Sequence, residues 1–238
     1  MKELIDNAQT LLGLRITQDQ RSALEIYERE LIEWNDRFNL TAIDDPRQIR
    51  VKHFLDSLTC LLAMRSTITD YVIDVGTGAG FPGVPLKILC PSINLTLVES
   101  VGKKALFCEH IVDYLNLTEV QVLQERAEIA GAAPDFRQKY SWALARAVAS
   151  LSVLVEYLLP FVRVGGYALA MKGESGPAEA QSAEDAIRLL GGQLHKLIPV
   201  TLPGVEEERY LIVITKTAAT PDRYPRRVGI PAKRPLPN

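Results

Sequence analysis

Short apolar runs separated by polar turns dominate the chain from residue 70 onward. They cover residues 71–75, 95–98, 120–123, 142–144 and 167–171. Runs of this length, bounded by glycine, proline or charged residues, are typical of buried strands. Because the strands would alternate with longer stretches able to form helices, the pattern predicts an α/β fold whose sheet is mostly parallel.

The residues before this region follow a helical period. Thr17 and Gln20 have the spacing of a capping box, which marks the start of a helix. Apolar residues then recur every three or four positions and form one face of that helix: Leu24, Tyr27, Leu31, Trp34 and Phe38. Asp45 and Pro46 begin a second helix, which contains His53. We therefore expect a helical extension over residues 1–69, a nucleotide-binding domain over 70–217 and a tail over 218–238.

Glycines follow the first predicted strand at alternate positions and predict a ligand site. Asp74 ends the strand, and Gly76, Gly78 and Gly80 come after it. Glycine lets the backbone approach a ligand closely, and a helix that begins near Pro82 would point its N–H groups at that ligand. Counted from Gly78, the pattern matches the dinucleotide fingerprint of NAD-binding proteins. Counted from Gly76, it resembles the first motif of class I S-adenosylmethionine-dependent methyltransferases.

Two further acids extend this predicted site. Glu99 ends the second strand, about 20 residues after the glycine turn, where an acid typically binds the ribose hydroxyls of a nucleotide. Both cofactor classes contain adenosine, so Glu99 does not choose between them. The third strand leads into residues 125–128, where Ala127 and Glu128 are placed to contact an adenine ring.

Charge is distributed unevenly along a chain whose formal net charge is only −2. The tail is basic and rich in proline, and we expect it to be extended rather than helical. Its cations, which can bind phosphates, include Arg226, Arg227, Lys233 and Arg234. The three cysteines have no metal-ligand spacing, and we predict no metal site. No apolar run is long enough to span a membrane and no signal peptide is evident, so we expect a cytoplasmic protein.

The chain resembles the glucose-inhibited division protein B family, the bacterial small-subunit ribosomal RNA (guanine-N7) methyltransferases. The resemblance rests on motifs spread over nearly the whole chain: Trp34-Asn35, Asn39-Leu40-Thr41, His53-Phe54-Leu55-Asp56-Ser57, Asp74 to Gly83, Arg146-Ala147 and Arg226-Arg227-x-Gly229-x-Pro231-x-Lys233. It implies a class I S-adenosylmethionine-dependent methyltransferase fold, a Rossmann-like doubly wound sheet that ends in an antiparallel pair near residues 196–200 and 210–216. It also implies cofactor contacts at Gly76, Phe81, Glu99, Ala127, Glu128 and Arg146.

The implied reaction methylates N7 of a specific guanine in 16S ribosomal RNA. N7 carries a lone pair and no proton, so no general base is needed and correct positioning can supply much of the catalysis. We therefore assign no catalytic residue and expect Arg146 and Lys172 to position the base. The expected partner is small-subunit ribosomal RNA or the 30S particle, bound by a monomer. Two alternatives stay open: a nicotinamide-dependent oxidoreductase, and a non-catalytic ribosome-assembly factor.

Overall fold

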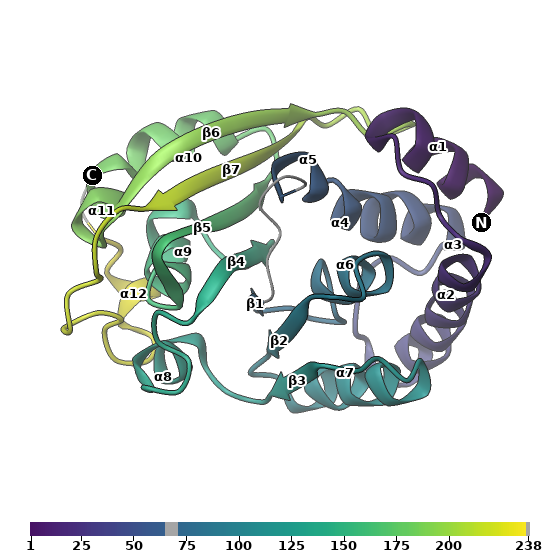
Figure 1. The fold of residues 1–238 in the computed structure, drawn as a ribbon, viewed down its shortest axis with the longest axis horizontal. Helices are drawn as coiled ribbons and strands as arrows, with labels where there is room; N and C mark the ends of the chain where they lie inside the picture. Colours follow the sequence, from purple (N-terminus) through teal and green to yellow (C-terminus); the bar gives the residue numbers. More distant parts are fainter. Residues whose placement is uncertain (65–70, 237–238) are drawn as a thin grey trace.

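The predicted apolar runs form the parallel part of a seven-stranded sheet in a computed structural model that describes residues 1–64 and 71–236 (Figure 1). The strands are β1 Tyr71–Val75, β2 Asn94–Val98, β3 Val120–Leu123, β4 Tyr140–Arg146, β5 Val162–Lys172, β6 Gly192–Val200 and β7 Arg209–Lys216. Their order across the sheet is β3-β2-β1-β4-β5-β7-β6. Strands β1 to β5 pair in parallel, whereas β7 runs antiparallel to both of its neighbours. The expected doubly wound class I fold with a final antiparallel pair is thus confirmed.

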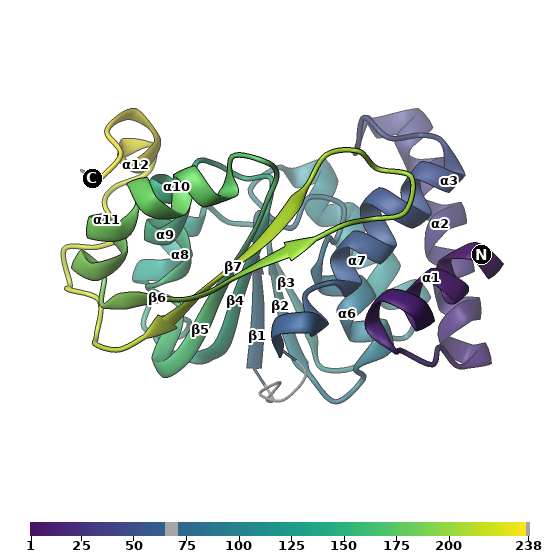
Figure 2. The same cartoon turned by 90° about the horizontal axis from the view of Figure 1, so that it is seen from above.

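Helices cover both faces of the sheet (Figures 1 and 2). One face carries α6 Gly83–Leu89 and α7 Gly102–Tyr114, together with the N-terminal helices. The other face carries α8 Ala127–Ala132, α9 Leu151–Leu158, α10 Gly176–Ser182 and α11 Glu184–Leu189. Each face has its own cluster of buried apolar side chains. Central strands such as β4 are therefore buried on both sides, and this is why they appear as continuous apolar runs rather than alternating ones.

The N-terminal extension packs against α6 and α7. It consists of α1 Lys2–Leu12, α2 Gln18–Phe38, α3 Pro46–Gln48, a π-helical segment Ile49–Leu55, α4 Asp56–Leu58 and α5 Leu61–Met64. The predicted capping box is present, since the Gln20 N–H donates to Thr17 Oγ1 at 3.2 Å and the Thr17 N–H donates to Gln20 Oε1 at 3.0 Å. The expected boundary between residues 69 and 70 lies outside the described residues.

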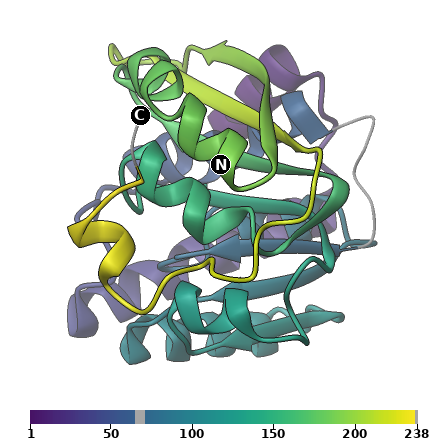
Figure 3. The same ribbon diagram turned by 90° about the vertical axis from the view of Figure 1, so that its left-hand side faces the viewer.

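The segment after β7 runs back along the side of the domain that α8 and α9 cover (Figure 3). Arg137 holds it there: Nη1 donates to the Tyr224 carbonyl at 2.7 Å and Nη2 to the Thr220 carbonyl at 2.8 Å. The expectation of a wholly extended tail is wrong for Ile230–Lys233, which form the short helix α12. Proline does not prevent this helix because Pro231 lies in its first turn, where no intrahelical N–H bond is lost.

Candidate cofactor and substrate site

The glycine turn lies at the carboxyl ends of β1 and β2. The N–H groups of Gly76 and Thr77 both donate to the Val98 carbonyl, at 2.8 and 3.1 Å, so the turn continues from the sheet. Gly76 has a φ of 70°, and a Cβ atom added there would lie 2.7 Å from Cγ2 of Val148. Only glycine fits this close approach between the turn and the segment that follows β4.

The buried Asp74 side chain links the glycine turn to the start of α6 by hydrogen bonds. It is fully buried, and its Oδ2 accepts hydrogen bonds from Thr77 Oγ1 at 2.6 Å and from the Gly83 N–H at 2.8 Å. Burial raises the pKa of this carboxyl to about 6, against the opposing effect of these two hydrogen bonds. Its Oδ1 has no hydrogen-bond partner among the described residues. Asp74 thus shapes the turn from below rather than lining the space above it.

Glu99 supports the same turn from β2. Its Oε2 accepts the Gly78 N–H at 2.9 Å and its Oε1 accepts the Val101 N–H at 2.8 Å. Each carboxylate oxygen can accept a second hydrogen bond, so this orientation leaves capacity for a hydroxyl donor. The acid predicted at the end of the second strand is therefore held at the glycine turn, as the βαβ geometry requires.

A cavity of about 270 Å³ opens beside this turn. Of the residues predicted to bind a cofactor, Gly76, Ala127 and Glu128 line it. The lining also includes Val148 and, from the C-terminal segment, Ala232. Its volume is close to the ~300 Å³ at which small-molecule sites begin. The glycine-rich turn, the oriented acid Glu99 and this cavity together fit an adenosine-containing cofactor.

Phe81 and Arg146, two other predicted cofactor contacts, lie against the N-terminal extension instead of in the cavity lining. The Phe81 ring stacks on His53, with centroids 4.5 Å apart, and the Arg146 guanidinium carbon lies 5.0 Å from the Phe81 centroid. Arg146 also donates to Asp56 Oδ2 at 3.1 Å and to His53 Nδ1 at 3.1 Å. Burial, and then the adjacent Arg146 charge, lower the pKa of His53 to about 3, so His53 is a neutral acceptor.

A second cavity, of about 150 Å³, lies at the carboxyl ends of β4 and β5 and the start of β7. Arg146 and Lys172, the two predicted positioning residues, both line it. Lys172 Nζ contacts Glu179 Oε2 at 2.8 Å and donates to the Ala149 carbonyl at 2.8 Å. The geometry therefore brings the two predicted positioning residues to one space.

Arg209 lines the same cavity and was missed from the sequence. Its Nε is buried and has no hydrogen-bond partner in the part of the chain that the structure describes. The one signal in the sequence was a single cation at the start of the last strand, directly after the acidic residues 206–208. That signal is weak, because such a residue is usually solvated.

A short connection separates the two cavities. Ala147 lines the smaller cavity, while Val148 and Ala149 line the larger one. Ala147 adopts a left-handed conformation with φ of 54°, which is uncommon for a residue other than glycine. Because consecutive residues of one connection line both spaces, a ligand in each would lie on either side of this segment.

The predicted RNA-binding residues of the tail have two kinds of environment. Arg226 forms an ion pair with Glu156 of α9, with its Nη2 2.6 Å from Oε2 of that fully buried carboxylate. Arg227, Lys233 and Arg234 are exposed. The structure thus places Arg226 in an internal contact and leaves the other three cations on the surface.

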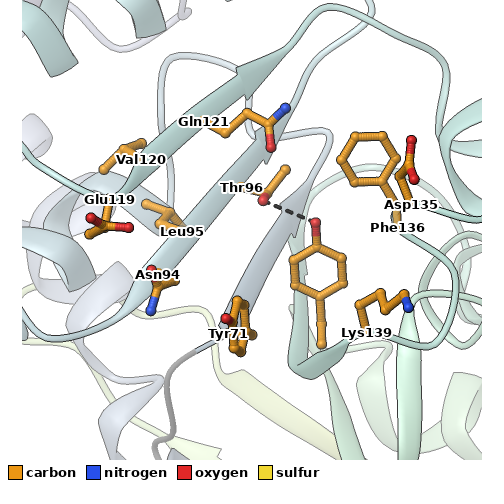
Figure 4. Close-up of a pocket in the computed structure, with 11 residues that line it drawn as sticks. Tyr71, Asn94, Leu95, Thr96, Glu119, Val120, Gln121, Asp135, Phe136 and Lys139 are labelled. Atoms are coloured by element: carbon orange, nitrogen blue, oxygen red, sulfur yellow. Dashed lines mark hydrogen bonds between the residues drawn. The ribbon is translucent and has the colours of Figure 1, made fainter.

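A larger cavity, of about 670 Å³, lies at the opposite edge of the sheet (Figure 4). It is lined by Tyr71 and Asn94, the first residues of β1 and β2, whereas the glycine turn follows the last residue of β1. Tyr140 donates a hydrogen bond to Thr96 across it at 3.0 Å. None of the predicted site residues lines this cavity.

The described residues include neither a membrane-spanning helix nor a cluster of metal ligands. Across residues 1–64 and 71–236, no helix is both long enough and apolar enough to cross a membrane. The same residues contain no group of three or more histidine, cysteine or acidic side chains placed to hold a metal ion.

Comparisons with known proteins show which proteins this chain is similar to. Two curated relatives are each called Ribosomal RNA small subunit methyltransferase G. The protein from Roseiflexus castenholzii is 52% identical over 99% of this chain and 100% of its own, and that from Pelotomaculum thermopropionicum is 48% identical over 99% of both. Among solved structures, TrmN from Thermus thermophilus matches with a TM-score of 0.51 and 18% identity over 70% of this chain and 53% of its own, which supports the fold alone.

The family comparison covers most of the chain. Residues 20–209 match the sequence model of the GidB family, described as rRNA small subunit methyltransferase G. The matched range contains the glycine turn, Glu99, Arg146 and Lys172, and it ends at Arg209. Of the residues that line the two cavities, only Tyr210, Leu211 and Ala232 lie outside it. Given this match and the near full-length relatives, the chain belongs to the GidB family of small-subunit ribosomal RNA methyltransferases.

Proposed function

We propose that this protein transfers a methyl group from S-adenosylmethionine to N7 of one guanine in 16S ribosomal RNA. The observation that carries the proposal is the pair of cavities on either side of residues 147–149. One has the glycine turn that a nucleoside cofactor requires, and the other has three cationic side chains. A methyl donor and a base held in these cavities would meet at the connection between them.

Residues at the glycine turn and around the cavity of about 270 Å³ would hold the cofactor. Gly76, Ala127 and Glu128 line the cavity and would border the cofactor, with Ala127 and Glu128 beside its adenine ring. Glu99, held at the glycine turn by the Gly78 N–H, has lone pairs for its ribose hydroxyls. S-adenosylmethionine, when bound, supplies an electrophilic methyl group on a positively charged sulfur. The protein's part is to hold that group in line with the guanine nitrogen.

Residues of the smaller cavity would orient the guanine. Its N7 attacks without losing a proton, so a general base has no role in the reaction. His53 agrees with such a mechanism, because its low pKa leaves it neutral and fully used as an acceptor for Arg146. The unpartnered Nε of Arg209 is a donor for the guanine O6 or for a neighbouring phosphate.

Two of the three cations that line the smaller cavity have their charge compensated. Methylation at N7 makes the purine positively charged, so each uncompensated cation beside it adds repulsion to the product. Arg146 and Lys172 are each paired with a carboxylate, Asp56 at 3.1 Å and Glu179 at 2.8 Å. They can therefore donate hydrogen bonds to the base while the paired acids compensate their charge.

The exposed tail cations would bind the RNA outside the reacting base. Arg227, Lys233 and Arg234 can contact phosphates, which would give an affinity that falls with salt and does not depend on sequence. We further propose that the protein acts as a monomer in the cytoplasm, where its ribosomal substrate is assembled.

The deciding experiment is methyl transfer from labelled S-adenosylmethionine to 30S subunits, and to their stripped RNA, that lack this modification. Borohydride–aniline cleavage then maps N7-methylguanine to a nucleotide. We expect one strong stop and, for Arg209→Ala, a loss of about 100-fold in kcat/KM. Arg188→Ala is the matched control, because Arg188 forms only exposed ion pairs on α11.

Three results would contradict the proposal in different ways. Methylation of another atom would refute the proposed chemistry. Cofactor binding without methylation of either RNA form would favour the non-catalytic assembly factor. Binding of NADH without binding of S-adenosylhomocysteine would favour the oxidoreductase.

A further inference from the structure

The C-terminal segment from Arg226 to Lys233, here named the clasp, is held against the domain by two buried carboxylates. Glu156 of α9 is fully buried and accepts hydrogen bonds from three donor groups of Arg226. Its Oε1 accepts from the backbone N–H at 2.7 Å and from Nε at 2.9 Å, and its Oε2 accepts from Nη2 at 2.6 Å. A buried carboxylate without a partner costs free energy, so the contact with Glu156 stabilises the docked position of the segment.

The second carboxylate belongs to the cofactor cavity itself. Glu128 lines that cavity, is 4% exposed, and accepts the N–H of Gly229 through Oε1 at 2.8 Å. Gly229 has a φ of 77° and precedes α12, so this bond sets where the short helix begins. The same side chain therefore contacts the cavity and the clasp.

The clasp also supplies part of the cavity wall. Ala232, on α12, lines the cavity together with Ala127 and Glu128, which follow β3. In this fold the acid after β2 marks the ribose position, so the β3 side is where the adenine ring lies. Pro231 is buried, whereas Ala232, which lines the open side of the cavity, and the cations Lys233 and Arg234 are exposed. One side of α12 thus packs on the domain while its cations remain in solvent.

We propose that the clasp covers the adenosine end of the cofactor cavity and slows release of the cofactor. The proposal rests on the proposed function, because it assumes that an adenosine-containing cofactor occupies that cavity. It gives residues 226–233 of the basic tail a role in cofactor retention, separate from phosphate binding by the exposed cations of the tail.

The test measures the affinity and dissociation rate of S-adenosylhomocysteine in the full chain, in two variants and in one control variant. Ala232→Trp places a large side chain in the cavity wall, and we expect its Kd to rise about tenfold or more. Pro235→Trp is the matched control: Pro235 is exposed, lies three residues further on and does not line the cavity, so its Kd should stay within about twofold.

The second variant removes the clasp and neutralises Glu156, the fully buried carboxylate that pairs with Arg226. It ends after Pro225 and carries Glu156→Gln, so the contacts of Arg137 to Thr220 and Tyr224 remain. We expect dissociation about tenfold faster than in the full chain. In the full chain, S-adenosylhomocysteine should also slow hydrogen exchange of the Gly229 amide, a change that a merely structural tail would not show.

The outcomes separate the two proposals. If the full chain binds S-adenosylhomocysteine and both variants bind and release it at the same rates, the clasp is refuted and the proposed function stands. If the full chain does not bind it, both proposals are overturned. Slower exchange at Gly229 together with faster release from the shortened chain would establish the clasp.

Discussion

The N-terminal extension packs against Phe81 of the glycine turn, whereas the clasp packs beside the cofactor cavity, and the two do so by different means. The extension does so with rings and one internal ion pair: Phe81 lies between His53 and Tyr27, and Arg146 lies over it. The clasp does so with carboxylates, which accept its backbone and guanidinium N–H groups. The first contact is mainly stacking and apolar burial, and the second is hydrogen bonding to buried charge.

The two segments therefore support different parts of the site. Phe81 belongs to the glycine turn itself, so the extension fixes the shape of the turn and the position of Arg146. Glu128 belongs to the cavity wall, so the clasp acts on the adenosine end. Stacking should be insensitive to salt. Docking of the clasp depends instead on the hydrogen bonds that Glu128 and Glu156 of the domain accept from it.

Removing the Phe81 ring should give the largest effect. Phe81→Ala deletes a buried side chain that three aromatic or imidazole rings contact, and the free energy of unfolding should fall by about 3–5 kcal/mol. Urea denaturation measures this. Phe38→Ala is the control, since that ring is 38% exposed on α2, and should cost clearly less. Equal losses in the two variants would mean that the stack does not brace the turn.

Breaking the clasp's ion pair should have the next largest effect. Arg226→Ala leaves the buried Glu156 unpaired, and we expect a loss of about 3 kcal/mol in the free energy of unfolding. The double variant with Glu156→Gln should recover part of this loss, because no charge is then left buried. A double variant that is less stable than Arg226→Ala would contradict the assignment.

Because His53 is held neutral in the extension, the free energy of unfolding should depend on pH. Its folded pKa of about 3 lies below the ordinary value, so the folded state binds fewer protons than the unfolded state and stability is lost as pH falls below about 6.5. Compared with His53→Gln, the wild type should lose about 1 kcal/mol between pH 6.5 and 5.5.

This comparison with the variant is needed because Asp74 acts in the opposite direction. Its pKa is raised to about 6, so its contribution to stability increases as pH falls toward 4. Asp74 is present in both proteins and cancels in the difference. Parallel stability curves for wild type and His53→Gln would show that His53 is not held neutral.

The smallest effect on stability should come from the outer face of the clasp. Arg227 is exposed, so Arg227→Ala should change the free energy of unfolding by less than about 0.5 kcal/mol. RNA affinity should nevertheless fall, and the slope of log K against log salt should decrease by about 1. Filter binding at several salt concentrations measures both quantities. An unchanged slope would remove Arg227 from the RNA surface.

Features written in contiguous residues could be predicted from the sequence. The strands, the capping box at Thr17 and the glycine turn each depend on side chains within a few positions of one another. The position of Glu99 followed from the regular length of a βαβ unit. The family resemblance added the final antiparallel pair, formed by β6 and β7.

Features that join distant residues could not be predicted in this way. Glu156 and Arg226 are far apart in the sequence, and nothing near either one indicates the other. The sequence alone predicts Arg226 to be an RNA contact, because extended arginines in a proline-rich tail can bind phosphates. Arg209 was overlooked because its significance comes from a buried Nε that only the packing of β5 against β7 creates.

The position of Ala232 in the cavity wall has a consequence for the order in which the protein is made. The ribosome synthesises Gly76 and Glu99 long before Ala232, and domains begin to fold while the chain is still emerging. The sheet can form once β7 has left the exit tunnel, but one wall of the cavity must wait for α12. An unfinished chain can therefore have the fold of this enzyme before it has a complete pocket.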